Sequence, residues 1–279
     1  MTRGVVATRA LGATGIVPTV VGIGTSAPSS MPGSYGYFID AAEAAEALDG
    51  LLEGPSTFVD TDANFGGGRG EQRIGAALAR GRGASITIAT KVDGDAASGR
   101  FDGSQVLRSA EESLHRLGVA RVPLLHLHDP ENVGFDASMA PGGPVEALAR
   151  LRDDGVAGSI DVAGGSAADL GSGVINAAHF GGGLLAHTTG RIDSYGYRPV
   201  SAALAQARDV MRAACARFDA PLAAAALQFS TRDRRIHTTI VRMSRPSGAT
   251  PTQELLDTCI PDELWVELDT LTSTGGVSK

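Results

Sequence analysis

Five ionisable side chains lie in or near the ends of short apolar runs, where they could do chemistry together. They are Asp60, Lys91, His126, His128 and Asp161. Side chains alternate across a β-strand, so the two histidines share one face. A carboxylate, an ammonium and an imidazole in one pocket are suited to acid–base catalysis at a carbonyl oxygen. Burying so many ionisable groups is costly unless they pair, so the set predicts a working polar pocket.

The elements that must position these groups alternate between strands and helices. Apolar runs typical of strands cover residues 20–24, 57–61, 86–91, 122–128, 159–163, 174–179 and 238–242. Amphipathic stretches with helical spacing cover residues 41–52, 71–80, 104–117, 144–153, 201–218, 221–228, 252–259 and 261–271. This alternation predicts repeated βα units, hence an α/β fold of the (β/α) TIM-type barrel kind in one domain over residues 1–279.

The strand pattern is one unit short of a complete barrel. It contains seven strand candidates, whereas a closed barrel of this kind has eight. The interval between Ala163 and Val174 is too short for the helix of a normal crossover. We therefore expect one βα unit to be missing or reduced. The edges this leaves would be covered either by the loop over residues 181–199 or by a second subunit, which would make a homodimer. At the start of the helix over 104–117, Ser104 is expected to be the N-cap.

Composition excludes several classes of protein. The 279 residues carry a net charge of −7 and are 43% hydrophobic and 20% charged, which suits a globular enzyme and not a nucleic-acid-binding protein. No apolar run approaches the ~20 residues that a membrane-spanning helix needs. The first residues contain no apolar signal core, so we expect a cytoplasmic protein that acts on a small molecule.

A series of motifs along the chain resembles the aldo-keto reductase family, in particular its sugar and L-galactose dehydrogenase-like branch. The most informative stretch, Phe58–Gly66, is similar to the family's Asp-Thr-Ala signature with its following Tyr-Gly. Similar motifs occur in the family's order at Leu11–Gly15, Gly70–Gly75, Ile88–Lys91, Arg108–Gly118, Leu125–Pro130 and Ile240–Pro246. The resemblance implies an aldo-keto reductase-like barrel, and hydride transfer from NADPH to a carbonyl with a tyrosine as proton donor.

Carried over by position, the resemblance implies catalytic roles for Asp60, Lys91 and His128. The tyrosine position holds Phe65, whose phenyl ring has no proton to give. The pair Ala163–Gly164 stands where the family has a Ser-Asn pair that contacts the nicotinamide. The missing βα unit would supply the aromatic residue that stacks on the nicotinamide. Because these losses all affect residues that would serve NADPH, we expect the protein to use no cofactor.

Further residues are expected to contact a substrate, namely Asp62, Phe65, His126 and Asp161. Asp62 fits equally well as the cap of the next turn. The alternative to a working pocket is a leftover ion-pair network, in which Asp60 pairs with Lys91 and Asp161 with His126. No close metal spacing such as His-x-x-x-His appears, so we expect no metal site.

Three functions remain open. The first, which we favour, is a non-redox acid–base enzyme (an isomerase, dehydratase or cyclase) for a carbonyl-bearing metabolite, in which Lys91 acts as a base or a cation if burial depresses its pKa. The second is an NADPH-dependent reductase with an unusual proton donor, such as water or His128. In that case the resemblance places the cofactor's phosphate loop at Arg242, Ser244 and Arg245. The third is a non-catalytic ligand-binding barrel.

Overall fold

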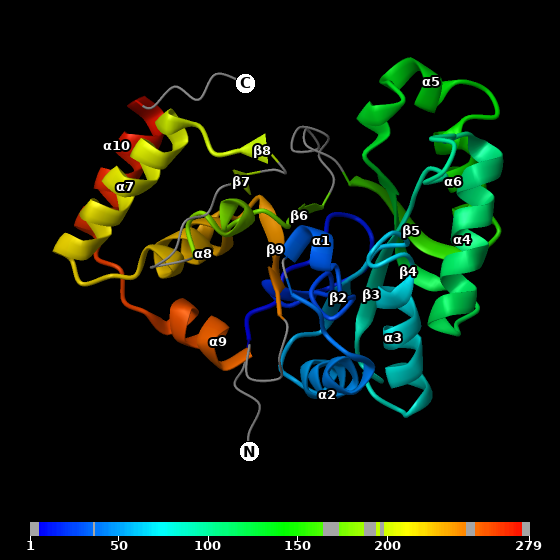
Figure 1. The fold of residues 1–279 in the computed structure, drawn as a ribbon, viewed down its shortest axis with the longest axis horizontal. Helices are drawn as coiled ribbons and strands as arrows, with labels where there is room; N and C mark the ends of the chain where they lie inside the picture. The colour runs from blue at the N-terminus through cyan, green and yellow to red at the C-terminus, as the bar shows by residue number, and fades with distance from the viewer. Residues whose placement is uncertain are drawn as a thin grey trace.

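A curled, seven-stranded parallel sheet forms the centre of the molecule (Figure 1). The computed structural model describes residues 6–35, 37–163, 173–186, 194–195, 198–243 and 249–274. The strand order is β5-β4-β3-β2-β1-β9-β6, and every pairing is parallel. The strands are β1 (Val21–Gly24), β2 (Phe58–Asp60), β3 (Thr87–Val92), β4 (Val122–His128), β5 (Ala157–Ala163), β6 (Val174–Asn176) and β9 (Ile236–Arg242). A small antiparallel hairpin, β7 (Ser194–Tyr195) with β8 (Arg198–Pro199), lies outside this sheet.

An apolar cluster on the inner face of the sheet shows that the sheet is curled. Phe58 of β2, Leu124 of β4 and Ile240 of β9 pack together there, although β4 and β9 are separated by three strands in the sheet order. Strands so far apart can share one cluster only if the sheet bends towards a barrel. In the described part of the chain, however, β5 and β6 remain its two edges. The expected α/β barrel type and its reduced strand number are thus confirmed.

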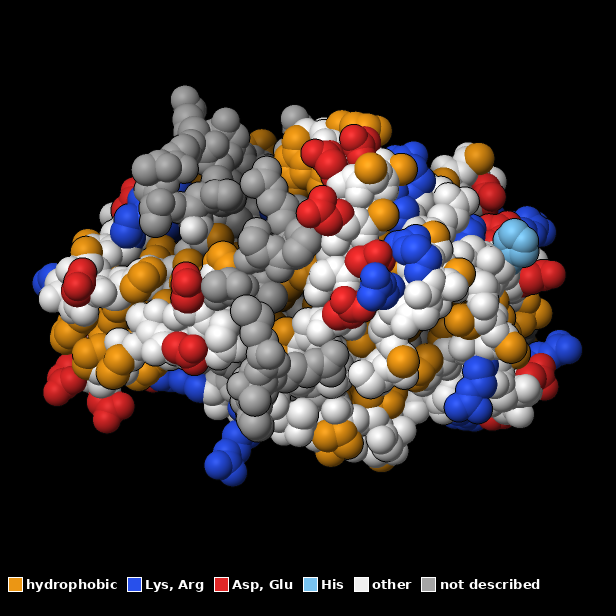
Figure 2. Space-filling view, turned by 90° about the horizontal axis from the view of Figure 1, so that it is seen from below, with side chains coloured by type: hydrophobic (Ala, Val, Ile, Leu, Met, Phe, Trp, Pro, Cys, Tyr) orange, Lys and Arg blue, Asp and Glu red, His pale blue; other side chains and the backbone are white. Residues whose placement is uncertain are grey.

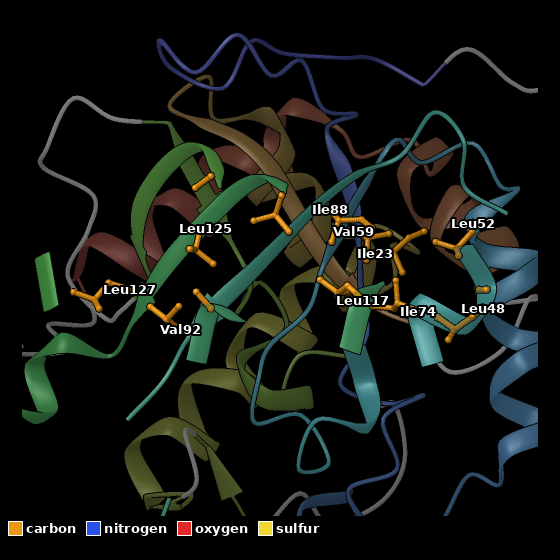
Figure 3. Close-up of a cluster of buried hydrophobic side chains, with 14 of the residues drawn as sticks. Ile23, Leu48, Leu52, Val59, Ile74, Ile88, Val92, Leu117, Leu125 and Leu127 are labelled. Carbon is orange, nitrogen blue, oxygen red and sulfur yellow. The ribbon is translucent and has the colours of Figure 1, made fainter. Parts of the chain in front are cut away.

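Four helices cover the outer face of β1 to β5 (Figure 1). They are α2 (Ala41–Leu52), α3 (Arg69–Ala79), α4 (Gly103–Leu117) and α6 (Pro144–Asp153). Figure 3 shows the main core between these two layers, where Val59, Ile88 and Leu125 meet Leu48, Ile74 and Leu117. Val59, Ile88 and Leu125 are the outward residues of their strands, so the residues next to them in sequence face the interior of the sheet.

The C-terminal half adds a second layer of helices beyond β9. It comprises α7 (Ala202–Arg217), α8 (Leu222–Arg232), α9 (Ala249–Asp257) and α10 (Asp262–Thr274). Helices α7 and α10 lie side by side at the end of the molecule opposite α4 and α6 (Figure 1). A separate apolar cluster joins them through buried residues such as Cys215 and Leu264. Short helices α1 (Pro32–Tyr35) and α5 (Phe135–Met139) complete the α-helices of the described chain.

The start of α4 differs from the sequence expectation. The N-cap is Asp102, whose carboxylate accepts a hydrogen bond from the Gln105 backbone N–H at 2.9 Å. Ser104 is already inside the helix, and its hydroxyl donates to the same carboxylate at 2.7 Å. The prediction of Ser104 as N-cap is therefore wrong, because both residue types are good caps and only the backbone geometry decides which one precedes the first turn.

The surface of the described chain is mixed in charge. On the face shown in Figure 2, Lys and Arg side chains lie interspersed with Asp and Glu side chains. Among the described residues, none of the helices combines the length and the apolar character that crossing a membrane requires.

Candidate active site

An inner layer of ionisable groups lies at the carboxyl ends of β2, β3 and β4. Lys91 donates hydrogen bonds to Asp60 Oδ1 at 2.8 Å and to the Thr61 carbonyl oxygen at 2.6 Å. The register of the sheet places His126 beside Lys91, and Asp161 beside His126. Active sites of parallel barrels lie at this end of the strands, because loops from several strands converge there.

Lys91 is a fixed cation. Burial alone would lower its pKa, but the charges of Asp60 and Asp62 and the hydrogen bond to Asp60 outweigh burial and raise the pKa instead. The condition under which Lys91 would act as a base, a pKa depressed by burial, is therefore not met. With its ammonium group held by two oxygen acceptors, Lys91 is suited to stabilising negative charge and not to accepting a proton.

An outer layer, which we call the Asp-Asp-His cluster, consists of Asp62, Asp93 and His128. His128 Nδ1 lies 2.8 Å from Asp93 Oδ1, to which it donates a hydrogen bond, and 2.9 Å from Asp62 Oδ2. Its other ring nitrogen, Nε2, is 3.7 Å from Asp129 Oδ2, beyond hydrogen-bond length. Asp62 Oδ2 is a close charge contact of the same ring nitrogen, and it has no assigned hydrogen-bond partner among the described residues.

The cluster spreads the pKa values of its members widely. Burial lowers the pKa of His128, but hydrogen bonding and the charges of Asp62 and Asp93 outweigh burial and raise it to about 10. The Asp62 carboxyl has a pKa of about 2, since His128 and Lys91 more than offset its burial. Burial and the neighbouring Asp62 charge raise the pKa of Asp93 to about 6. At neutral pH the imidazole is consequently protonated beside two carboxylates.

Asp93 is the member of the site that the sequence reasoning missed. Its backbone N–H donates to Ser109 Oγ at 3.1 Å, and its carbonyl oxygen accepts from Gln105 Nε2 at 3.3 Å, so α4 fixes its position. The strand period could have identified Asp93, because it follows Lys91 by two residues and residues two apart lie on the same face of a strand. The same spacing relates Asp62 to Asp60 and His128 to His126, so each outer group extends an inner one.

His126 and Asp161 do not form the ion pair that was one of the two interpretations. Among the described residues, His126 Nδ1 is buried without a hydrogen-bond partner, and the Asp161 carboxylate accepts from the Val162 backbone N–H at 2.8 Å. Burial, followed by the nearby charges of Lys91 and His128, lowers the pKa of His126 to about 3. His126 is thus a neutral ring beneath the charged cluster, and Asp161 borders the site without joining it.

Phe65 stands over Lys91, where the resemblance places a tyrosine. The Lys91 ammonium lies 5.4 Å from the centre of the phenyl ring, within the range of a cation–π contact. The ring is half-buried and contributes an apolar wall to the site. The lysine and its aspartate partner are therefore retained, while the hydroxyl group whose acidity they would tune is absent from this residue.

The residues that would meet a nicotinamide ring fit it poorly in the described part of the chain. Ala163, the last residue of β5, offers no polar side-chain atom, and β5 is an edge of the sheet. At the other end of the cofactor's path, Arg242 ends β9 with an exposed side chain that has an interaction of its own. Ser244 and Arg245 lie outside the described residues. Within the described part of the chain, Ala163 does not supply the polar nicotinamide contact that the resemblance implies.

Comparison with known proteins identifies the family. The model of the aldo/keto reductase family matches residues 20–170, which is more than half of the chain and spans β1 to β5 with Asp60, Lys91 and His128. The chain belongs to the aldo/keto reductase family. The matched range includes Phe58–Gly66, the stretch whose sequence resembles the family signature.

The similar curated proteins are dehydrogenases, two of them for sugars, in line with the sugar-dehydrogenase-like branch. D-threo-aldose 1-dehydrogenase of a Pseudomonas species is 27% identical, with 81% of this chain and 87% of that protein covered. Pyridoxal 4-dehydrogenase of Microbacterium luteolum is 26% identical, with 97% and 98% covered. L-galactose dehydrogenase of Arabidopsis thaliana is 30% identical over 56% of this chain and 48% of its own length.

Solved aldo/keto reductase structures share the fold. An aldo-keto reductase of Bacillus halodurans in its holo form superposes with a TM-score of 0.75 at 18% identity, covering 95% of this chain and 96% of that one. Glycerol dehydrogenase of Gluconobacter oxydans gives a TM-score of 0.73 at 16% identity, with 98% and 97% covered. The expectation that this family member uses no cofactor gains no support from these comparisons, because its named relatives are oxidoreductases.

Proposed function

We propose that this aldo/keto reductase family member is an acid–base enzyme that moves a proton at the carbon next to the carbonyl group of a sugar-like aldehyde or ketone. The observation that carries the proposal is the Asp-Asp-His cluster beside Lys91, at a site where Phe65 provides no phenolic proton. The substrate class follows the names of the relatives, two of which are dehydrogenases of aldoses or galactose.

His128 is suited to the role of proton donor in place of a tyrosine. Its pKa of about 10 equals that of an ordinary phenol, about 10. Nδ1 is held by Asp93, so the hydrogen on Nε2 is left for a substrate oxygen. Lys91, a fixed cation in the layer below, would stabilise the negative charge that develops on that oxygen.

Asp93 is suited to the role of base. Its pKa of about 6 lies close to working pH, where a carboxylate accepts a proton most effectively. Its Oδ2 atom accepts no hydrogen bond from the described part of the chain. In the proposed step the substrate C–H bond breaks, the proton goes to Asp93, and the resulting enolate oxygen receives the Nε2 proton of His128. Two groups whose surroundings push their pKa values apart in this way are a recurrent acid–base arrangement.

Hydrogen exchange into heavy water tests this proposal without knowledge of the product. Aldoses and 2-ketoses are incubated with the purified protein in D₂O. Loss of the signals of hydrogens next to the carbonyl group, C2–H in aldoses and C1–H or C3–H in 2-ketoses, is followed by proton NMR. We expect exchange with at least one sugar, and a fall of about 100-fold or more in the Lys91→Met variant, the scale of acid–base and charge-stabilising contributions. Asp95→Asn, which changes a partly exposed acid beyond β3, is the matched control and should exchange like the unaltered chain. Exchange that persists in Lys91→Met, or none with any sugar, would overturn the proposal.

The second candidate is an NADPH-dependent oxidoreductase, which is favoured by the dehydrogenase relatives that align with most of the chain. Calorimetric titration with NADPH and NADP⁺ separates the two candidates. Micromolar binding together with NADPH oxidation by an aldose would establish the oxidoreductase. No binding at millimolar cofactor would exclude it and leave proton transfer.

A further inference from the structure

We propose that the Asp-Asp-His cluster is a binding site for one divalent transition-metal cation, held by Asp62, Asp93 and His128. These three residues offer one carboxylate oxygen each from Asp62 and Asp93 and one imidazole nitrogen from His128, and the three atoms lie within 4.8 Å of one another. They come from the carboxyl ends of three adjacent strands, β2, β3 and β4, so the sheet itself sets their separation.

Two buried carboxylate oxygens in the cluster lack hydrogen-bond donors. Asp62 Oδ2 and Asp93 Oδ2 are both buried and accept no hydrogen bond among the described residues. The Asp62 side chain is fully buried, with 0% of its surface exposed, and Oδ2 is directed at His128 Nδ1, 2.9 Å away. A buried carboxylate oxygen without a donor carries a large desolvation cost, which a directly bound cation removes.

The spacing of the ligand atoms suits metal coordination. Ligands bound at about 2.1 Å and about 90° apart lie about 3.0 Å from each other. The distances from His128 Nδ1 to Asp93 Oδ1 and Asp62 Oδ2 are 2.8 and 2.9 Å. Three ligands on one face of an ion leave its other positions open for water or a substrate oxygen. Mixed imidazole and carboxylate ligands favour ions such as Zn²⁺ and Mn²⁺ over Mg²⁺, which prefers oxygen ligands alone.

The charges around the cluster can accommodate the ion. The Lys91 ammonium is 3.9 Å from Asp62 Oδ2, but its charge is balanced by Asp60 at 2.8 Å. The carboxylates of Asp62 and Asp93 then balance the two charges of the cation. The ion takes the place of the hydrogen on His128 Nδ1 and engages Asp93. The metal-bound chain is therefore distinct from the metal-free chain in which Asp93 acts as the base, and the metal site is proposed independently of the proton transfer.

No metal site was expected from the sequence, because each ligand follows a different strand and no two are close in the chain. Asp62, Asp93 and His128 are each separated by a complete helix and loop. Short metal motifs such as His-x-x-x-His arise when one helix supplies two ligands. A site assembled across a parallel sheet has no such signature.

Metal binding by the full chain, free of any tag and previously treated with EDTA, tests the proposal. Calorimetric titration with ZnCl₂ and with MnCl₂ should show one ion bound per chain, and MgCl₂ should bind more weakly than either. Asp93→Asn should weaken Zn²⁺ binding by about 100-fold or more, since loss of even an outer partner of a metal ligand costs about 10–100-fold. His128→Gln is a second variant for the case that Asp93→Asn does not fold, as judged by circular dichroism.

Asp161→Asn is the matched control, because Asp161 is a partly buried acid on the same sheet but outside the cluster. It should bind Zn²⁺ as the unaltered chain does. Absence of Zn²⁺ and Mn²⁺ binding at millimolar concentration, or equal binding by folded Asp93→Asn, would overturn the proposal. Because no sugar is present in this titration, its failure is distinct from a failure of the proposed proton transfer.

Discussion

Charge balance explains why so many ionisable residues persist inside this sheet. Lys91 is neutralised by Asp60 directly, and His128 is neutralised by two carboxylates that differ in acidity. Breaking a buried pair by removing one partner is strongly destabilising, because it leaves an uncompensated charge. The residues of the site therefore constrain each other, and single substitutions there need a folding control.

His179, outside the site, should make stability depend on pH. Among the described residues, neither of its buried ring nitrogens has a hydrogen-bond partner, and burial lowers its pKa from 6.5 to about 4. Between pH 6.5 and about 4, His179 is protonated in the unfolded chain but not in the folded chain. The free energy of unfolding therefore falls as the pH is lowered through this range. At neutral pH, the free energy of unfolding of the His179→Leu variant should equal that of the unaltered chain or exceed it by up to about 1 kcal/mol.

The difference between the two chains should grow in the acidic window. Urea unfolding at a pH above the window and at one within it measures this difference. A difference that stays constant between the two conditions would show that the imidazole of His179 is reached by protons in the folded state.

At the scale of elements, the helix start that was wrongly assigned offers a direct comparison. Asp102→Ala removes the N-cap carboxylate of α4 and should lower the free energy of unfolding by about 1 kcal/mol. Ser104→Ala removes a hydroxyl that donates a hydrogen bond to that carboxylate. This variant should change the free energy of unfolding by less than about 0.5 kcal/mol. Thermal or urea unfolding of the two variants checks the order. A larger effect from Ser104→Ala would restore Ser104 as the cap.

What the sequence can predict here depends on the range of the interactions involved. The inward direction of Asp60, Lys91 and His126 follows from strand period alone, and the structure agrees. The pKa of Lys91 could not be predicted, because its direction depends on whether burial or two nearby carboxylates prevail. Asp93 was missed since it lies past the apolar run of β3, and its role exists only through contact with His128 of the next strand.

At the scale of the molecule, the open sheet leads us to propose association into a homodimer. Edge strands β5 and β6 have unpaired sides in the described chain, and such edges are normally covered. Sedimentation velocity over a dilution series should give about twice the chain mass of 28.5 kDa. A species of 28.5 kDa at every concentration would contradict the proposal and show that the chain covers its own edges.

The two-residue spacing between the inner and outer ionisable groups limits how this site can change during evolution. Lys91 and Asp93 share a direction only because one residue stands between them, and the same holds for His126 and His128. Inserting or deleting a single residue there turns one group of each couple to the opposite face. Point substitutions can therefore retune the acidity of this site gradually. A change of length at these strand ends would disrupt the site in one step. Among related sequences, the spacing of these positions should therefore vary less than the residue types found at them.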